Sequence, residues 1–304
     1  MSNLAFVVTR SVHFAAAMLM LGVWLFDRLV ASVIEPSTAW RKISGWLIGI
    51  ALPIAAVSAV AWFGDLSISI NDDIPPRSAL AWPMLKAILN ETQFGFVWKV
   101  RAGMWLGCCV LSLLIFKTKT LRGTWTWLAI LCSVGFVGSL AWAGHGQTGP
   151  DMALHLCSDV IHLLATTLWP MGLLPFALLF FCVRRSSDTS LHVKLTNRFS
   201  SISFWTVVIL LASGIINSWI LVGSLNNLFH TPYGQTLVRK IVVFGFMVFS
   251  GAINFILLKP RLPASPVASR WLQWNVAIEL MLMIVVLVIV GYLGLQPPPV
   301  EFSP

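Results

Sequence analysis

Long apolar blocks separated by short polar connections make up most of this sequence of 304 residues. A helix needs about 20 apolar residues to cross a bilayer, and the blocks reach that length. Because lipid offers no hydrogen-bond partner to a bare backbone, each block is predicted to be an α-helix. The pattern therefore predicts an all-α polytopic membrane helix bundle, with residues 1–304 forming a single transmembrane domain. Eight helices are predicted, at about 4–30, 43–70, 95–116, 125–143, 153–183, 199–222, 237–258 and 272–295.

The composition argues against a soluble enzyme. Hydrophobic residues make up 58% of the chain and charged residues only 10%. Soluble α/β enzymes also have apolar runs, but these are strands of about 4 to 8 residues between frequent charges. The chain has no G-x-x-x-x-G-K-[ST] phosphate loop, and we expect no enzymatic activity. The first block is too long for a signal peptide and has no basic segment before it, so it is predicted to be retained.

Positive charge is concentrated in alternate connections, and the formal net charge is +9. Cytoplasmic loops of membrane proteins carry an excess of Lys and Arg. The connections after the first, third, fifth and seventh helices are therefore predicted to be cytoplasmic, and both termini periplasmic. The positive charge is thus explained by the orientation of the chain in the membrane, and it gives no support to a nucleic-acid partner. These connections hold 13 of the 20 Lys and Arg residues: Arg28, Arg41, Lys42, Lys117, Lys119, Arg122, Arg184, Arg185, Lys194, Arg198, Lys259, Arg261 and Arg270.

Five of the six histidines are predicted on the outer side of this topology, and only His192 is predicted to be cytoplasmic. Such an uneven distribution favours a site near the periplasmic surface. The outer set comprises His13 in the first helix, His145 before the fifth helix, His155 and His162 within the fifth helix, and His230 before the seventh.

Helical periodicity aligns the polar residues of the fifth predicted helix. At about 100° per residue, Met152, His155, Asp159 and His162 fall within one narrow stripe. Ionisable groups cost roughly 2.5 to 3.5 kcal/mol or more at the bilayer centre, so the stripe is predicted to face the bundle interior. In the first helix, a second set shares a face in the same way: His13, Met20 and Asp27.

Imidazole and thioether groups together suit copper. Thioether sulfur favours Cu(I), imidazole accepts either oxidation state, and a carboxylate favours Cu(II). Asp159 could instead orient a histidine by accepting its second ring N–H. Each residue also has a structural interpretation: a histidine that hydrogen-bonds between helices, Met20 as a packing residue, and Asp27 as a salt-bridged residue at the cytoplasmic boundary.

Other polar residues lie within the predicted helices. Glu279, Asn217 and Asn254 are predicted either to line a pathway toward the cytoplasm or to hydrogen-bond between helices. Four basic residues lie at outer helix ends, against the charge trend. They are explained by snorkelling, or by attraction for an anionic ligand or an acidic docking partner. These four are Lys99, Arg101, Arg239 and Lys240.

Five stretches carry a resemblance over nearly the whole chain. They are RSVHFAAAMLMLG around His13, TQFGFVWKVRAG from Thr92, the region 145–162 followed by LWPMGLLP, TPYGQTLVRK from Thr231, and GAINFILLKPRL from Gly251. In their order and spacing they resemble the copper resistance protein D (CopD) family of bacterial inner-membrane proteins. The family often carries Trp-x-Gly-Gly after the histidines of the fifth helix, whereas residues 169–172 here read Trp-Pro-Met-Gly. The proline is expected to kink that helix.

The resemblance implies an eight-helix protein of the bacterial inner (plasma) membrane that handles copper. It also implies a small periplasmic copper-binding protein of the CopC type as a common partner. By the same resemblance, four residues occupy the outward-side histidine positions of the family: His13, His145, His155 and His162.

Residues and resemblance together lead to a copper-transport hypothesis. Copper, as Cu(I) or Cu(II), is predicted to bind on the periplasmic side and to pass through the bundle into the cytoplasm. The predicted metal ligands are His13, His145, His155, His162 and His230, together with Met20, Met152 and Asp159.

Two alternatives stay open. One is a b-type cytochrome for electron transfer, in which facing histidines ligate haem and the outer Lys and Arg residues hold its propionates. The other is a membrane partner of a periplasmic copper chaperone that does not transport copper itself.

Overall fold

A computed structural model of the chain describes residues 3–33, 38–118, 122–143, 152–184 and 189–302. Within these ranges every regular element is a helix and none is a strand. Eight segments are long and apolar enough to cross a membrane, which confirms the predicted all-α polytopic bundle. The spans are Leu4–Val33, Thr38–Ile70, Gln93–Lys117, Arg122–Trp142, Met152–Val183, Ser190–Val222, Pro232–Arg261 and Pro266–Leu293.

Nine long helices form these spans, because one span consists of two consecutive helices. Their bounds are α1 (Asn3–Leu29), α2 (Thr38–Ile70), α5 (Gln93–Lys117), α6 (Arg122–Gly138), α7 (Met152–Leu168), α8 (Leu173–Val183), α9 (Thr189–Val222), α11 (Pro232–Ile253) and α12 (Pro266–Leu293). The short elements are η1 (Ala31–Val33), α3 (Pro76–Ala79), α4 (Trp82–Glu91), η2 (Ser139–Ala143), α10 (Leu225–His230), the π-helix η3 (Asn254–Leu258), η4 (Lys259–Arg261) and η5 (Pro299–Phe302).

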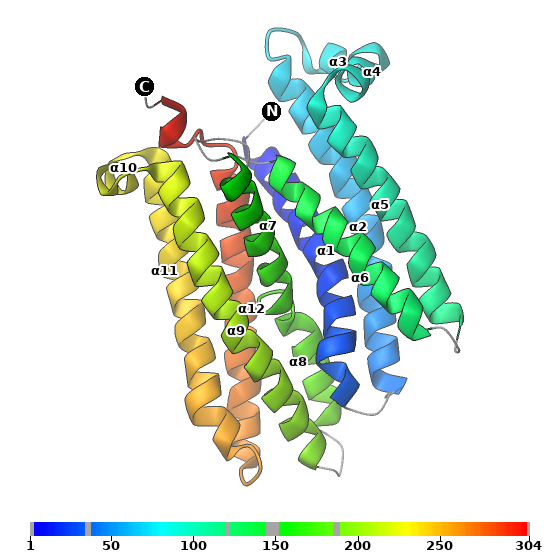
Figure 1. The fold of residues 1–304 in the computed structure, drawn as a ribbon, viewed down its shortest axis with the longest axis vertical. Coiled ribbons are helices and arrows are strands. Elements are labelled where there is room, and N and C mark those ends of the chain that lie inside the picture. The colour runs from blue at the N-terminus through cyan, green and yellow to red at the C-terminus, as the bar shows by residue number, and fades with distance from the viewer. Residues whose placement is uncertain (1–2, 34–37, 119–121, 144–151, 185–188, 303–304) are drawn as a thin grey trace.

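Helix α1 lies between two groups of helices (Figure 1). It packs against α2 and α6 on one side and against α7 and α12 on the other. Helix α5 packs on α6, α9 on α7, and α11 on α12. The start of α1 and the end of α12 lie at one end of the bundle, together with α3, α4 and α10 (Figure 1). We call this the terminal end, and the opposite one the distal end.

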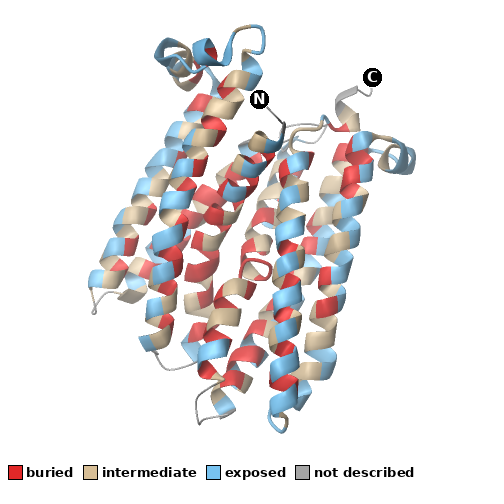
Figure 2. Ribbon diagram, turned by 180° about the vertical axis from the view of Figure 1, so that it is seen from behind, coloured by how far each residue is buried: buried red, intermediate tan, exposed pale blue. Residues whose placement is uncertain are grey.

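Large apolar side chains cover the outward faces of the helices. Val57, Val60, Trp219 and Phe246 are among the exposed ones. The buried residues face the middle of the bundle and the exposed ones its periphery (Figure 2). Soluble monomers rarely expose contiguous apolar patches of this extent, so these faces are the surface that contacts lipid.

The predicted helix 153–183 is interrupted in the structure, where α7 ends and α8 begins. Pro170 has no N–H, and its ring would clash with a helical carbonyl four residues earlier. The Met171 N–H therefore bonds five residues back, to the Thr166 carbonyl at 3.1 Å. At Gly172 a Cβ would collide with the Leu168 carbonyl oxygen and press on the ring of Phe199. The kink expected at the proline is confirmed, and the single continuous helix is wrong.

Several helices begin earlier than their apolar blocks, and α9 and α12 do so by the largest margins. Helix α9 begins at Thr189, ahead of the block predicted from 199, and α12 begins at Pro266, ahead of 272. The start of α12 is fixed by a helix cap, because the Ser265 hydroxyl accepts a hydrogen bond from the Ala268 N–H at 3.2 Å. Polar first turns such as these extend beyond the hydrocarbon region, so hydropathy alone does not detect them.

Candidate functional site

A polar cavity of about 170 Å³ lies where α1, α7, α9, α11 and α12 meet. Its position near Gly294, at the end of α12, places it in the half of the bundle toward the terminal end. Helix α7 contributes His155, Asp159 and His162 from successive turns. Other helices complete the polar part of the lining, with Arg10 from α1, Asn217 and Ser218 from α9, and Tyr233 and Lys240 from α11.

Three of the four residues in the polar stripe predicted on the fifth helix line this cavity. His155 is only 1% exposed, and Asp159 and His162 line the cavity beside it. Met152, in the first turn of α7, is 53% exposed and is not part of the lining. The structure therefore brings together two imidazoles and a carboxylate, without the predicted thioether.

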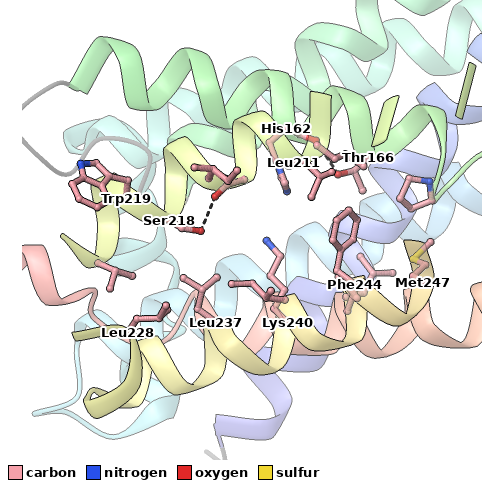
Figure 3. A pocket seen from close by; sticks show the side chains of 18 of the residues that line it. His162, Thr166, Leu211, Ser218, Trp219, Leu228, Leu237, Lys240, Phe244 and Met247 are labelled. Atoms are coloured by element: carbon pink, nitrogen blue, oxygen red, sulfur yellow. Dashed lines mark hydrogen bonds between the residues drawn. The ribbon is translucent and has the colours of Figure 1, made fainter. Parts of the chain in front are cut away.

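The hydrogen bonds of His162 leave one ring nitrogen available. Nδ1 lies 2.9 Å from the Ser213 hydroxyl oxygen. That hydroxyl donates its own hydrogen to the Ile209 carbonyl at 2.7 Å, so it accepts the Nδ1–H of the ring. The imidazole is thereby held in the tautomer whose Nε2 carries a free lone pair, and the ring points into the space between α7 and α11 (Figure 3). A metal ligand needs this arrangement, in which one nitrogen is anchored and the other is unprotonated.

Two buried polar atoms around the polar cavity have no hydrogen-bond partner among the described residues, Arg10 Nε and Asn217 Oδ1. One other nitrogen of each side chain is paired. Arg10 Nη1 donates to the Gly294 carbonyl at 3.0 Å, and Asn217 Nδ2 donates to Asp159 Oδ1 at 3.4 Å. Because buried polar groups are nearly always satisfied, the two unpaired atoms indicate that the cavity takes up water or a polar guest.

An apolar cavity of about 440 Å³ continues from the polar one. The two share His162 and Lys240 in their linings. Figure 3 shows these two side chains pointing toward one another from α7 and α11, with Phe244 and Met247 farther along α11. The apolar cavity runs between α9 and α11 from α10, at the terminal end, to Pro170 and Met247, and its lining is mostly hydrocarbon.

His13 lies in a different environment, among α2, α5 and α6. Its Nδ1 is 3.1 Å from the Ala55 carbonyl oxygen, which can only accept, so Nδ1 carries the ring hydrogen. Its Nε2 accepts a hydrogen bond from Arg101 Nη2 at 2.5 Å. The ring is fully buried beside Trp62 and Trp98, with centroid distances of 5.4 and 6.1 Å. Both nitrogens are engaged, and His13 does not line the polar cavity beside His155 and His162.

The other predicted ligands are dispersed. Across the described residues, no three His, Cys, Asp or Glu side chains form a group that could hold a metal ion. Met20 is 1% exposed and packs in the apolar core. His230 is exposed, and its Nδ1 donates to the Asn226 carbonyl of its own helix at 2.9 Å. Asp27 forms a salt bridge with Arg122 at 3.4 Å, as its structural interpretation predicts. His145 lies outside the described residues.

Two of the four outer basic residues turn inward. Arg101 is 3% exposed and also donates to the Phe136 carbonyl at 3.0 Å, while Lys240 lines both cavities. Lys99 and Arg239, their neighbours, are exposed as snorkelling predicts. Arg10 also lines the polar cavity, although the sequence patterns did not predict it there. It could have been found as a basic residue one helical turn before His13 in an otherwise apolar helix.

Comparison with known proteins gives two consecutive family matches. Residues 1–156 match the family described as Copper resistance protein D-like, N-terminal domain. Residues 193–293 match the family described as Copper resistance protein D. The first match alone covers half of the chain. No solved structure matches the chain.

Three curated proteins are similar to the chain. "Copper transport protein CutJ" of Bacillus subtilis is 26% identical over 71% of this chain, which spans only 39% of the length of CutJ. "Copper resistance protein D" of Pseudomonas syringae pv. tomato is 25% identical over 73% of this chain and 74% of its own length. "Inner membrane protein YebZ" of Escherichia coli is 26% identical over 96% of this chain and 98% of its own length.

Proposed function

Because the chain belongs to the copper resistance protein D family, we propose that it moves copper across the bacterial inner membrane through the polar cavity. It is a multi-pass protein of that membrane, in keeping with its eight spans and its similarity to an inner membrane protein. The names of the relatives support copper as the cargo. The proposal assigns no catalytic step to the protein.

The observation that carries the proposal is the geometry of His162. Its ring is anchored through Nδ1 to Ser213, which leaves the lone pair of Nε2 free to bind a metal ion beside a cavity that His155 and Asp159 also line. Imidazole binds both Cu(I) and Cu(II). The described side chains form no group of three that could hold a metal ion, so copper is proposed to bind the two histidines, with Asp159 orienting His155.

This assignment differs from the sequence-based one in the role of His13. A copper ion could reach that imidazole only by displacing Arg101 from Nε2. We therefore propose that His13 joins helices and that the α7 histidines bind the cargo. No described contact favours the haem alternative, because His13 and His162 do not face a common space that could hold a porphyrin.

We propose that copper moves inward, and the charge distribution supports this direction. The excess of Lys and Arg in the connections at the distal end favours that end as the cytoplasmic one and the terminal end as the periplasmic one. The polar cavity lies toward the terminal end, so copper enters from the periplasm and leaves to the cytoplasm. A small periplasmic copper-binding protein of the CopC type is the proposed donor at the terminal end.

Equilibrium copper binding by the purified protein tests the site. The variant with His155→Ala and His162→Ala is expected to lose copper that the wild-type protein binds. His230→Ala is the matched control, because this exposed histidine lies toward the same end and bonds only to its own helix. Unchanged stoichiometry and affinity in the double variant would contradict the assignment. A visible absorption spectrum of the same sample tests haem, whose Soret band is expected to be absent.

A further inference from the structure

Glu279 is a buried carboxyl group that copper binding at the α7 histidines does not use. It lies near the middle of α12 and is 1% exposed. An ionisable side chain within the hydrocarbon region costs several kcal/mol, so such residues are rare and commonly functional. Glu279 has no cationic partner among the salt bridges of the described residues. Its carboxyl group therefore needs a proton, or some other source of stabilisation, to remain in the membrane interior.

Neutral donors surround the carboxyl group. Asn254 Nδ2 donates to Glu279 Oε1 at 2.5 Å, and the indole of Trp169 is a second hydrogen-bond partner. Asn275 supports Asn254 by donating to its Oδ1 at 2.8 Å, and Ser250 donates to Asn275 Oδ1 at 2.9 Å. The donors around Glu279 thus form an ordered neutral network, which accommodates a carboxyl group without introducing a compensating charge.

A third cavity, of about 350 Å³, gives this carboxyl group an open side. It lies between the α7–α8 break, α9, the end of α11 and α12, in the half of the bundle toward the distal end. Thr196, Ser200 and Ser203 of α9 line it opposite Glu279, and Ser203 Oγ is buried without a hydrogen-bond partner among the described residues. These hydroxyl groups are able to hold water against the carboxyl group.

Among the described residues that line this distal cavity, Glu279 is the only titratable one. Titratable groups on the neighbouring elements face elsewhere. On α9, the ring of His192 packs against Phe180. On η4, the ammonium group of Lys259 lies 4.5 Å from the centre of the Phe255 ring, and Lys259 is not part of the cavity lining. From α1, Arg10 meets α12 at Gly294, at the other end of the bundle.

Both hydrogen-bond donors to Glu279 lie where a helix departs from α geometry. Asn254 is the first residue of the π-helix η3, and Trp169 begins the break between α7 and α8. Single-turn π-helices occur frequently at functional sites, and transporters bind their ions at interrupted helices. These two irregular segments converge on the one carboxyl group of the distal cavity.

An aromatic contact separates the distal cavity from the apolar one. The rings of Trp169 and Phe244 meet edge to face with centroids 6.1 Å apart. Trp169 lines the distal cavity, whereas Phe244 and Pro170 line the apolar one. Trp169, the indole that hydrogen-bonds Glu279, therefore also forms, with Phe244, the partition between the half of the bundle with the α7 histidines and the distal half. A change in the charge of Glu279 would act directly on that partition.

We propose that Glu279 is a proton-binding site that couples copper movement to proton binding and release. The protonated carboxyl group gives its proton to water in the distal cavity and becomes a carboxylate, and it takes a proton back from the same water. The carboxylate strengthens its hydrogen bonds to Trp169 and Asn254, and the neutral acid weakens them. Trp169 thereby transmits the protonation state to the partition. The coupling rests on the proposed copper transport, whereas the proton binding itself does not.

Infrared difference spectroscopy between acidic and alkaline buffer tests proton binding without copper. The wild-type protein is expected to show the carbonyl band of a protonated carboxyl group that disappears at alkaline pH. Glu279→Gln is expected to lack that band, while Glu279→Asp retains one. A wild-type spectrum with no such band, or a band that persists in Glu279→Gln, would overturn the proposal whether or not the protein transports copper.

Copper flux into proteoliposomes at a series of pH values tests the coupling. Gln keeps an oxygen that accepts from Asn254 and Trp169, so a purely structural Glu279 predicts wild-type behaviour for Glu279→Gln. Proton coupling instead predicts a flux that no longer depends on pH, with copper binding at the α7 histidines unchanged. Asn275→Ala is the control, because it disturbs the network but leaves the carboxyl group, and it is expected to retain the pH dependence. A pH dependence that survives in Glu279→Gln, or that is lost equally in Asn275→Ala, would overturn the coupling.

Discussion

Arg101 donates a hydrogen bond from Nη2 to Nε2 of His13 at 2.5 Å, where α1, α2, α5 and α6 meet. The guanidinium also lies 4.7 Å from the centre of the Phe136 ring. Hydrogen bonds to neutral partners, of which His13 is one, thus offset the cost of burying the Arg101 guanidinium. The two residues are 88 positions apart in the chain, and their hydrogen bond connects α1 to α5.

His13→Ala is expected to destabilise the protein without abolishing copper binding. The change leaves Arg101 Nη2 without its buried acceptor and removes the ring beside Trp62. A hydrogen bond to a charged group contributes about 1.5 to 3 kcal/mol, so the free energy of unfolding should fall by about that amount. Thermal unfolding in detergent, followed by tryptophan fluorescence, measures the loss. Loss of bound copper at unchanged stability would instead show that His13 is a ligand.

Ser213→Ala is expected to weaken copper binding while the fold is preserved. The serine hydroxyl anchors Nδ1 of His162, and removing such a group typically weakens metal binding about 10- to 100-fold. Ser218→Ala is the matched control, because that serine lines the polar cavity with His162 but donates to the Gly214 carbonyl of its own helix at 2.6 Å. Isothermal titration with Cu(I) and with Cu(II) gives the affinities. Equal effects in the two serine variants would argue against the anchoring role.

Lys240→Met is expected to strengthen copper binding. The Lys240 amino group faces His162, and a positive charge there repels a metal cation. Removing a repulsion of about 1.4 kcal/mol raises affinity about tenfold. Arg239→Met, at the exposed neighbouring position, removes the same formal charge outside the cavity and should change affinity little. If Lys240→Met abolished binding, the lysine would instead be required for a cargo with negative charge, such as copper bound to an anion.

Gly172→Ala is expected to lower the free energy of unfolding by about 1 to 3 kcal/mol, the usual effect of overpacking. A Cβ at this position meets the Leu168 carbonyl and lies 3.1 Å from the Phe199 ring. Gly49→Ala is the control, since a Cβ there has no heavy atom within 4 Å and the position lies within α2. Thermal unfolding of both variants gives the comparison. A stable Gly172→Ala protein would indicate that residues 169–172 can adopt another backbone path.

The stripe on α7 was predictable because helical periodicity alone places His155, Asp159 and His162 on one face. The cost of buried charge then determines that this face points inward. The partner of His13 was not predictable in the same way. It depends on how α1 is rotated against α2 and α5, and residue spacing within one helix contains no information on that rotation.

The inward orientation of the Arg101 and Lys240 side chains could not be predicted from the sequence either. Each stands beside a second basic residue that points outward, and local sequence does not show which of the two turns inward. Hydropathy likewise located the span 152–183 but not its interruption, although Pro170 marked the place. The fold follows from the apolar pattern, whereas the site depends on contacts between helices that are distant in the chain.

Uptake of labelled copper by proteoliposomes tests the central claim most directly. The comparison uses the wild-type protein, the His155→Ala and His162→Ala double variant, and His230→Ala. We predict that the wild-type protein and His230→Ala carry copper in from the side of the terminal end, and that the double variant carries no more than protein-free liposomes. Equal flux through the double variant, or no flux through the wild-type protein, would contradict transport through the polar cavity.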